Sequence, residues 1–282
     1  GLITMSKYSI LVDVTKCNGC YNCFLSCRDE YYGNDYPAYS AAQPLNGQFW
    51  MQVNEIERGV YPKPKVSYIP KPCMHCESAP CIDAAKDGAV YRRDDGIVMI
   101  DPDKARGQQG IVNACPYRVI YWNAEKEIPQ KCTMCAHRLD EGEKEPRCVE
   151  SCPTGALVFG DLDDPNSAIA QLAARLDTES LHPEFNTDCL VQYVGIPKRF
   201  VAGEVVYKGN EGECAPGVKV TLTGGGLTLE TITDLFGDFE FEGLGKNETY
   251  TLVAAADGYA ESTLEFTTFK DVNLGEIVLE AR

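Results

Sequence analysis

Fourteen cysteines stand in this chain of 282 residues, and twelve of them lie between Cys17 and Cys152. The first four form the run Cys17-Asn-Gly-Cys20-Tyr-Asn-Cys23-Phe-Leu-Ser-Cys27, which has the spacing C-x2-C-x2-C-x3-C. This spacing is typical of 4Fe–4S ligands, because three closely spaced thiolates can hold three corners of one cube while the turn carries the fourth away. Zinc ligation and disulfides are the alternatives, although zinc sites favour separated C-x2-C pairs.

The other eight cysteines of this region divide into three groups. They are Cys73, Cys76 and Cys81; Cys115 alone; and Cys132, Cys135, Cys148 and Cys152. Proline follows Cys115 and Cys152, as it follows the last ligand of the bacterial cluster run. These groups therefore continue the pattern of the first run.

A simple rule divides the twelve cysteines without remainder. In proteins with two such runs, the fourth cysteine of one run completes the cluster of the other. Applied here, the rule gives a first set of Cys17, Cys20, Cys23 and Cys152, a second set of Cys27, Cys132, Cys135 and Cys148, and a third set of Cys73, Cys76, Cys81 and Cys115. We expect three 4Fe–4S clusters, with these twelve cysteines as iron ligands.

A fourth site of the same kind is missing as a whole. Counting back from Cys115 by the same spacing reaches Ala105, Gln108 and Ile111, and counting four on from Cys81 reaches Ala85. Random loss of cysteines would leave half-built sites. The pattern therefore predicts a four-cluster scaffold from which one complete site has been lost.

The elements that must hold these cysteines are short. Residues 8–12 and 97–100 are strand candidates, and residues 94–96 carry a hairpin signal before the second strand. Long loops surround the cysteine groups, so we expect bound clusters to fix the loops. Residues 165–177 have the start signal and apolar spacing of a short amphipathic helix.

The C-terminal part has a different composition. From residue 200 onward only Cys214 remains, and seven strand candidates alternate with glycine-, asparagine- and aspartate-rich turns. They are residues 201–207, 218–223, 228–233, 238–241, 250–254, 263–267 and 276–279. We expect three parts: residues 1–165 with the clusters, a helix with a linker or interface segment at 166–199, and a seven-stranded β-sandwich at 200–282.

Charge and apolar patterning exclude several functions. Lysine and arginine total 26 against 42 aspartates and glutamates, which gives a formal net charge of −16 and disfavours nucleic acid and anionic membranes as partners. No apolar run approaches the roughly 18 residues of a membrane span, and the N-terminal segment lacks export-signal features. We expect a cytoplasmic protein.

No catalytic residue is predicted. The three histidines, His75, His137 and His182, form no nucleophile–base pair with a neighbour in sequence, and the first two stand beside cluster cysteines. Cys189 and Cys214 lie outside every motif and are expected to be free thiols, with a disulfide between them as the alternative.

Residues 1–165 resemble the four-cluster ferredoxin-type electron-transfer subunits of the DMSO-reductase family of molybdopterin enzymes. The segments that carry this resemblance are 73–81, 88–90, 95–101, 114–117 and 152–160. Residues 215–222 and 233–239 resemble the carboxypeptidase-regulatory-like or prealbumin-like sandwich. The expected fold is therefore α+β, a double ferredoxin-like iron–sulfur domain with long loops followed by a small all-β sandwich.

The resemblance implies an electron-transfer role beside a large catalytic subunit that holds a molybdenum or tungsten bis-pterin cofactor. The expected arrangement, three clusters followed by a β-domain, resembles that of transhydroxylase-like members of the family. These members act on phenols of the pyrogallol to phloroglucinol type. In membrane-bound relatives the fourth cluster lies near the quinone-reactive subunit, so no membrane subunit is expected here.

Two alternatives stay open. The same electron path could serve a phenol dehydroxylase or hydroxylase, or an arsenate or sulfur-compound reductase. Alternatively, the chain is a structural or binding scaffold with redox-silent clusters. Cubane EPR signals after dithionite reduction would distinguish an electron-transfer chain from a scaffold.

Overall fold

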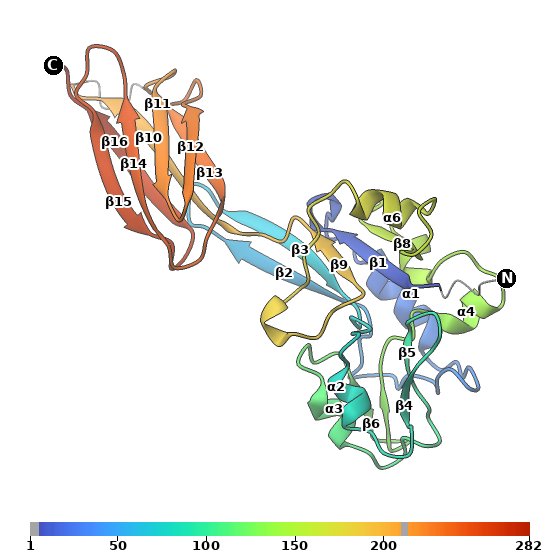
Figure 1. Ribbon diagram of the computed structural model, residues 1–282. Coiled ribbons are helices and arrows are strands. Elements are labelled where there is room, and N and C mark those ends of the chain that lie inside the picture. Colours follow the sequence, from blue (N-terminus) through green and yellow to red (C-terminus); the bar gives the residue numbers. More distant parts are fainter. Residues whose placement is uncertain (1–5, 210–213) are drawn as a thin grey trace. The chain divides into compact units, whose positions relative to one another are not determined.

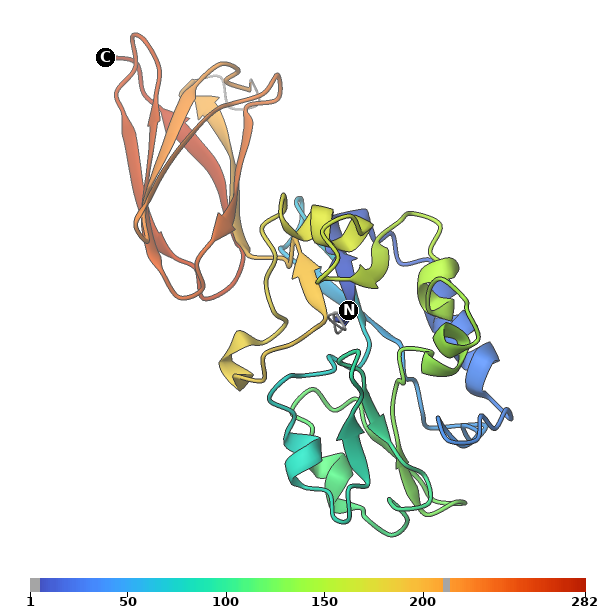
Figure 2. The ribbon, with the colours of Figure 1, turned by 45° about the vertical axis from the view of Figure 1, so that its right-hand side comes forward.

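A computed structural model describes residues 6–209 and 214–282 of the chain. The chain forms two compact units, Gly1–Ile56 with Ser67–Ile196, and Glu57–Val66 with Pro197–Arg282. The segment 166–199 is expected to be a helix with a linker or interface segment. Its residues 166–196 belong to the first unit, where their helix and last strand pack, and residues 197–199 belong to the second (Figures 1 and 2).

A three-stranded sheet organises the first unit. Its central strand β1 (Tyr8–Asp13) pairs antiparallel with β8 (Leu157–Asp161) and parallel with β9 (Gln192–Val194) (Figure 1). The last five residues of β1 are buried, so the strand is covered on both faces. Helix α6 (Ala168–Ala173) packs on β8, and the Ser167 hydroxyl caps it by accepting a hydrogen bond from the Ala170 N–H at 3.1 Å.

Short helices and hairpins make up the rest of the first unit. The helices are η1 (Val14–Lys16), α1 (Asn22–Tyr31), α2 (Pro80–Asp83), α3 (Gly110–Ala114), α4 (Ala136–Asp140), α5 (Arg147–Glu150) and η2 (Pro183–Phe185). The hairpins are β2 (Gln52–Arg58) with β3 (Lys65–Lys71), β4 (Val90–Arg92) with β5 (Val98–Ile100), and β6 (Tyr121–Asn123) with β7 (Ile128–Gln130). The predicted hairpin around residues 94–96 is the β4–β5 hairpin.

The tip of the β2–β3 hairpin, residues 57–66, belongs to the second unit. Ion pairs attach it to strand β13: Lys63 pairs with Asp238, and Lys65 pairs with Glu240. Pairs of this partly exposed kind are individually weak, so the attachment depends on several of them acting together.

The second unit is a sandwich of two sheets, ordered β13-β10-β16 and β12-β11-β14-β15. The strands are β10 (Arg199–Tyr207), β11 (Lys219–Gly224), β12 (Leu227–Ile232), β13 (Asp238–Leu244), β14 (Thr249–Ala255), β15 (Ser262–Thr267) and β16 (Val272–Leu279). Each of the seven predicted strands overlaps one of them. Alternate residues of β11, β13 and β14 point inward, which closes a core that includes Val220, Phe239 and Leu252.

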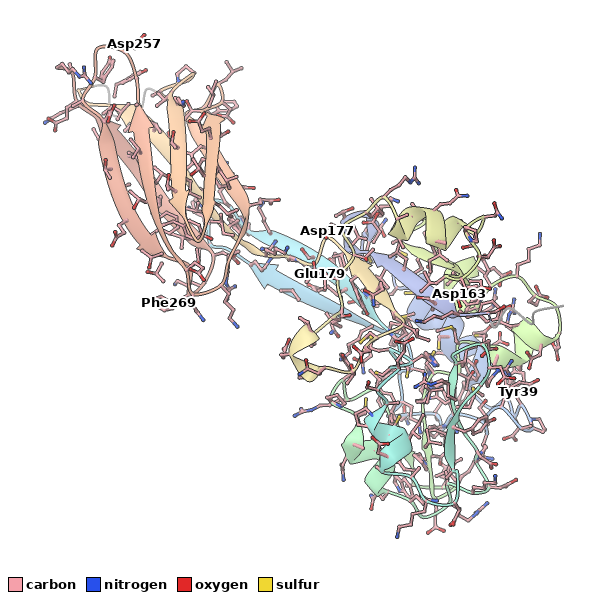
Figure 3. All side chains as sticks on the ribbon, viewed as in Figure 1. Tyr39, Asp163, Asp177, Glu179, Asp257 and Phe269 are labelled. Atoms are coloured by element: carbon pink, nitrogen blue, oxygen red, sulfur yellow. The ribbon has the colours of Figure 1, made fainter. Side chains whose placement is uncertain are left out.

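The loops of the sandwich lie at its two ends, where Asp257 and Phe269 mark opposite ends of strand β15 (Figure 3). Gly224 ends strand β11, and Gly225 and Gly226 form the tight turn to β12. A side chain at Gly224, where φ is 150°, would place its Cβ 2.3 Å from the Thr249 carbonyl oxygen, so only glycine fits there.

Replacing Thr233 with valine is expected to destabilise the second unit by about 1–3 kcal/mol. The buried Thr233 hydroxyl donates to the Ala215 carbonyl at 2.6 Å and accepts from the Val218 N–H at 2.9 Å. Valine has nearly the same shape but leaves both backbone groups unpaired inside the sandwich. Urea unfolding of the second unit measures the change, with the exposed Thr228→Val as control. An unchanged midpoint would contradict the role of this hydroxyl.

Candidate iron–sulfur cluster sites

The fold brings cysteines that are distant in sequence next to one another, and all fourteen are free thiols. In the first set, Cys17 and Cys23 both interact electrostatically with Cys152. In the second set, Cys27 interacts with Cys132 and Cys135, and Cys148 interacts with all three of these thiols. In the third set, Cys73 interacts with Cys76, Cys81 and Cys115.

The three sets are connected in a row. Cys23 of the first set interacts electrostatically with Cys27 and Cys148 of the second set. Cys132 of the second set interacts with Cys73 of the third. The second set therefore adjoins both of the others.

Helices α1 and α5 position thiols of the first two sets. Cys23 and Cys27 lie one turn apart on α1, and Cys148 lies on α5. A hydrogen bond of 2.7 Å between the hydroxyls of Ser26 and Ser151 joins the two segments. These contacts explain how Cys27 reaches the second set although it belongs to the first run.

The Cys73–Cys76 and Cys132–Cys135 loops share a backbone conformation that directs N–H groups at sulfur. His75 and Met134 both have positive φ, 45° and 52°. The His75 N–H lies 3.5 Å from Cys73 Sγ, and the Met134 N–H lies 3.3 Å from Cys132 Sγ. Such N–H donors stabilise negative charge on a ligand sulfur and help to set the potential of a cluster.

Burial makes isolated thiolates unfavourable in these sites. It raises the pKa of Cys23 to about 12, the pKa of Cys132 to about 12 and the pKa of Cys81 to about 11. Burial also acts to raise the pKa of Cys152, but hydrogen bonds from the Leu157 N–H and from Thr154 outweigh it and lower that pKa. Thiolates in this environment need a compensating positive charge, which iron supplies when it displaces the thiol protons.

Two buried groups fit a cluster beside the third set. His75 is 1 % exposed and accepts a hydrogen bond from the Val98 N–H at its Nδ1, so its Nε2 carries the proton. Within the described residues this buried Nε2 has no hydrogen-bond partner. Lys131 is 2 % exposed, and its ammonium donates to the carbonyls of Val98 and Cys132. A buried N–H donor and a buried cation are suitable neighbours for an anionic cluster with thiolate ligands.

The four positions at which the sequence lacks cysteines for a fourth site are packed against other parts of the chain. Ala105 and Ile111 are fully buried in a small apolar cluster, and Ala85 packs against it. The Gln108 side chain accepts from the Lys86 N–H at 2.8 Å and donates to the Lys104 carbonyl at 2.8 Å. Apolar contacts and one amide thus join the segments that a fourth cluster would join.

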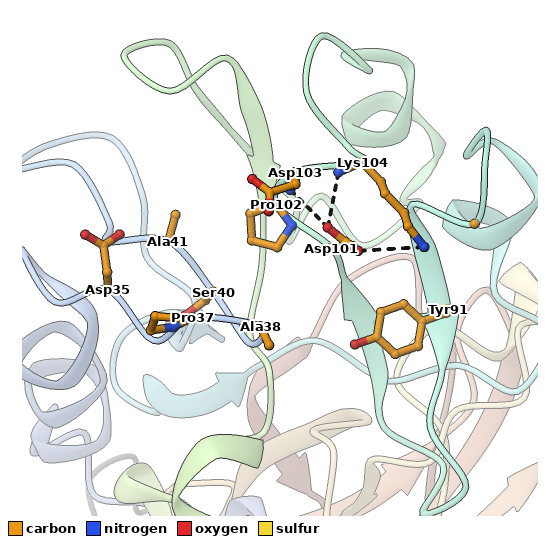
Figure 4. A pocket seen from close by; sticks show the side chains of 11 residues that line it. Asp35, Pro37, Ala38, Ser40, Ala41, Tyr91, Asp101, Pro102, Asp103 and Lys104 are labelled. Carbon is orange, nitrogen blue, oxygen red and sulfur yellow. Dashed lines mark hydrogen bonds and ion pairs between the residues drawn. The ribbon is translucent and has the colours of Figure 1, made fainter.

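One cavity of the first unit is separate from the cysteines. It has a volume of about 840 Å³ and is lined by Asp35, Tyr91, Asp101 and Lys104 among others, and by none of the twelve cysteines (Figure 4). The Asp101 carboxylate accepts hydrogen bonds from the N–H groups of Asp103 and Lys104 at 3.0 and 3.1 Å. The Asp101 carboxylate therefore already has hydrogen-bond donors from within the chain.

Two further properties of residues 6–209 and 214–282 bear on the class of protein. None of the helices there combines the length and apolarity needed to span a bilayer. No three or more His, Cys, Asp and Glu side chains in these residues converge closely enough to hold a single metal ion. The thiolates of a cubane cluster stand at its corners, farther apart than ligands about 2.3 Å from one zinc ion.

The structure identifies residues near the thiols that sequence reasoning missed. Tyr31, fully buried, hydrogen-bonds to the Thr133 hydroxyl at 2.8 Å and lies near Cys135. Lys131 could have been found from its position directly before Cys132. Cys189 is the third case: backbone hydrogen bonds from Leu190 to Met74 and from Glu77 to Asp188 hold it beside the Cys73–Cys76 loop, and no spacing rule links the two segments.

Comparison with known proteins places this geometry in a family. Residues 64–162 match the family described as a 4Fe-4S dicluster domain, and residues 201–280 match the carboxypeptidase regulatory-like domain. The chain is 41% identical to the pyrogallol hydroxytransferase small subunit of Pelobacter acidigallici, over 98% of this chain and 100% of that protein.

Other relatives match about two thirds of this chain. A putative dimethyl sulfoxide reductase iron-sulfur subunit of Halobacterium salinarum is 36% identical over 67% of this chain and 79% of its own length. The arsenate respiratory reductase iron-sulfur subunit of a Shewanella species is 30% identical over 67% of this chain and 96% of its own. The chain belongs to the 4Fe–4S electron-transfer subunits of the DMSO reductase family, in the branch of the pyrogallol hydroxytransferase small subunit.

Proposed function

We propose that this chain carries electrons through three 4Fe–4S clusters, held by the first, second and third cysteine sets, for a large catalytic partner. The observation that carries the proposal is the convergence of twelve cysteines, distant in sequence, into three groups of thiols that are all buried or half-buried except Cys20. The unpaired His75 Nε2–H and the buried Lys131 support it, because both suit an anionic group beside the third set.

The roles of the chain's own residues follow from this arrangement. The thiolates hold iron, backbone N–H groups donate to sulfur, and burial keeps water away from Cys27 and Cys148. When bound, such clusters exchange single electrons with little rearrangement. Because the second set adjoins both others, electrons would pass along the row from one end set to the other.

The first set is the proposed contact with the partner. Cys20 is exposed, and the neighbouring apolar side chains Leu25 and Phe49 are 59% and 42% exposed. Phe49 stacks on Phe24 at 5.1 Å between ring centroids, next to Cys23 in sequence. An exposed ligand beside apolar surface suits electron exchange across a protein interface.

We propose a molybdenum or tungsten bis-pterin cofactor on the partner and a phenolic hydroxyl transfer there, of the pyrogallol to phloroglucinol type. Similarity to the pyrogallol hydroxytransferase small subunit covers the sandwich as well as the cluster domain. Relatives named for arsenate or dimethyl sulfoxide reduction match only about two thirds of this chain, which makes such a reductase the second candidate. No membrane subunit is proposed, because the fourth-cluster positions are filled by apolar packing and Gln108.

Anaerobic purification of the native complex tests this proposal. The expected result is one co-purifying large chain with molybdenum or tungsten, conversion of pyrogallol by the complex, and cubane EPR signals after dithionite reduction. Turnover of arsenate or a sulfoxide, but not of pyrogallol, would show that the complex is a reductase, the second candidate function. A co-purifying haem- or quinone-binding subunit would contradict the proposal that electrons do not leave this chain toward a membrane subunit. Clusters that dithionite cannot reduce would show that the chain is a scaffold.

A further inference from the structure

Two stretches of the first unit contain no charged residue. They are residues 17–27, which carry the first cysteine run, and residues 36–54, although charged residues make up 24% of the chain. The centre of a protein–protein interface is depleted of charge and enriched in aromatic side chains, whereas an ordinary solvated surface is not. These two stretches are therefore where an interface of this chain is to be sought.

The two uncharged stretches meet and expose apolar side chains there. Leu25 on helix α1 is 59% exposed, and Leu45 and Phe49 on the loop 43–49 are 63% and 42% exposed. The Phe49 ring stacks on that of Phe24 at 5.1 Å between centroids, which joins the loop to the helix. We call these four side chains the α1–loop patch. Apolar surface gathered in this way marks a site that a partner covers.

Arg28, one turn after Leu25 on α1, holds the loop against the helix. Its guanidinium donates to the carbonyl oxygens of Pro44 at 3.3 Å, Leu45 at 2.9 Å and Gln48 at 3.2 Å. No other donor in the described part of the chain reaches these three carbonyls. A single side chain therefore fixes the backbone of the loop that carries half of the patch.

The α1–loop patch adjoins the first cysteine set. Phe24 directly follows Cys23, and the ring of Tyr21, which directly follows Cys20, packs edge-on against Phe24 at 6.1 Å between centroids. Among the twelve cysteines of the three sets, Cys20 alone is exposed. A protein that covers the patch would therefore lie beside the one set that has an exposed thiol.

We propose that the α1–loop patch is the docking surface for the large catalytic partner, and that Arg28 is a positioning residue that holds the loop in the conformation the partner binds. This inference deepens the proposed function and rests on it. The proposed electron path leaves the chain at the first set, and electron tunnelling slows steeply with distance, so that partner must lie close to Cys20. A second copy of this chain fits less well, because two chains with a formal net charge of −16 repel each other.

Leu45→Asp tests the docking surface and is expected to weaken binding of the large chain by about tenfold or more, because a carboxylate would be buried there without a partner. Sedimentation of the anaerobically diluted complex measures the dissociation constant, and iron analysis shows that the clusters are intact. Leu235→Asp is the matched control. Leu235 is 83% exposed in the second unit, and its substitution should leave the dissociation constant unchanged.

Arg28→Lys tests the positioning role. Lysine keeps the charge but lacks the planar fork of donors that a guanidinium offers to several carbonyls at once. It should weaken binding of the large chain and leave the cluster EPR signals as in the wild type. In the double variant with Leu45→Asp, the lysine should add little further loss of affinity, because both changes act through the same loop. A fully additive loss would show that Arg28 does not act through the loop.

The outcomes separate this inference from the proposed function. Leu25→Asp repeats the surface test on the helix and carries it if a loop variant loses iron. Wild-type affinity in iron-replete Leu45→Asp and Leu25→Asp, or an equal loss in Leu235→Asp, would overturn the docking surface and leave the proposed function intact. A wild-type chain that binds no large chain, or that shows no cubane signals after reduction, would overturn the proposed function itself.

Discussion

Cys27→Ala is expected to abolish the cluster of the second set and to leave the first-set cluster in place, although Cys27 belongs to the first cysteine run. The reason is the path of helix α1, which directs Cys23 toward Cys17 and Cys152 but brings Cys27 to Cys132 and Cys135. Iron should fall from about twelve to about eight atoms per chain, since each cube contains four. Anaerobic iron analysis and EPR of the reduced complex measure the change.

Variants of the other cysteines in the first two sets test whether the two sets exchange their fourth ligands. Cys132→Ala should remove the same EPR signal as Cys27→Ala, whereas Cys152→Ala should remove the signal that Cys17→Ala removes. Cys214→Ala should leave all iron in place. If Cys27→Ala and Cys17→Ala removed the same signal, the first run would bind a single centre by itself, and the exchange of fourth ligands would be wrong.

Removal of the clusters is expected to unfold the first unit and to spare the second. The core of the first unit contains the cysteines themselves, among them Cys23, Cys27 and Cys148, and its regular elements are short. Loops held by thiolate–iron bonds lose their cross-links when iron leaves. The second unit has an apolar core of its own, built from seven strands.

Hydrogen exchange after oxidation and chelation under anaerobic conditions measures this difference. Amides of α1 and β1 should exchange more than about 100-fold faster, which corresponds to a loss of ~2.8 kcal/mol at ~1.4 kcal/mol per tenfold change. Amides of β11 and β14 should keep their protection. Equal loss of protection in both units would show that the sandwich depends on the clusters, and retained protection of α1 would show that the first unit folds without iron.

Much of this architecture could be predicted because it depends on residue patterns within short stretches of the sequence. The seven strands of the sandwich alternate inward and outward residues between glycine turns such as Gly224–Gly226, and Ser167 caps α6 within the predicted helical range. The loss of a fourth cluster site stays a prediction, which rests on Ala85 and Ile111 at two of the expected ligand positions. The structure adds that these two residues lie in or against an apolar cluster.

The contacts that sequence reasoning missed are non-local. Strand β9 pairs in parallel with β1 and brings the neighbouring Cys189 to the Cys73–Cys76 loop. A parallel pair has no hairpin turn to reveal it in the sequence. The tip of the β2–β3 hairpin joins the second unit through lysines that pair with acidic residues of β13, and no local signal connects residues so far apart in sequence.

The central claim is that twelve cysteines hold three 4Fe–4S cubes, and iron and acid-labile sulfide analysis of the anaerobically isolated complex tests it most directly. After iron on any partner cluster has been subtracted, the prediction is about twelve iron and about twelve sulfide per copy of this chain. Bound zinc in place of iron, or a count near four, eight or sixteen iron atoms, would contradict it.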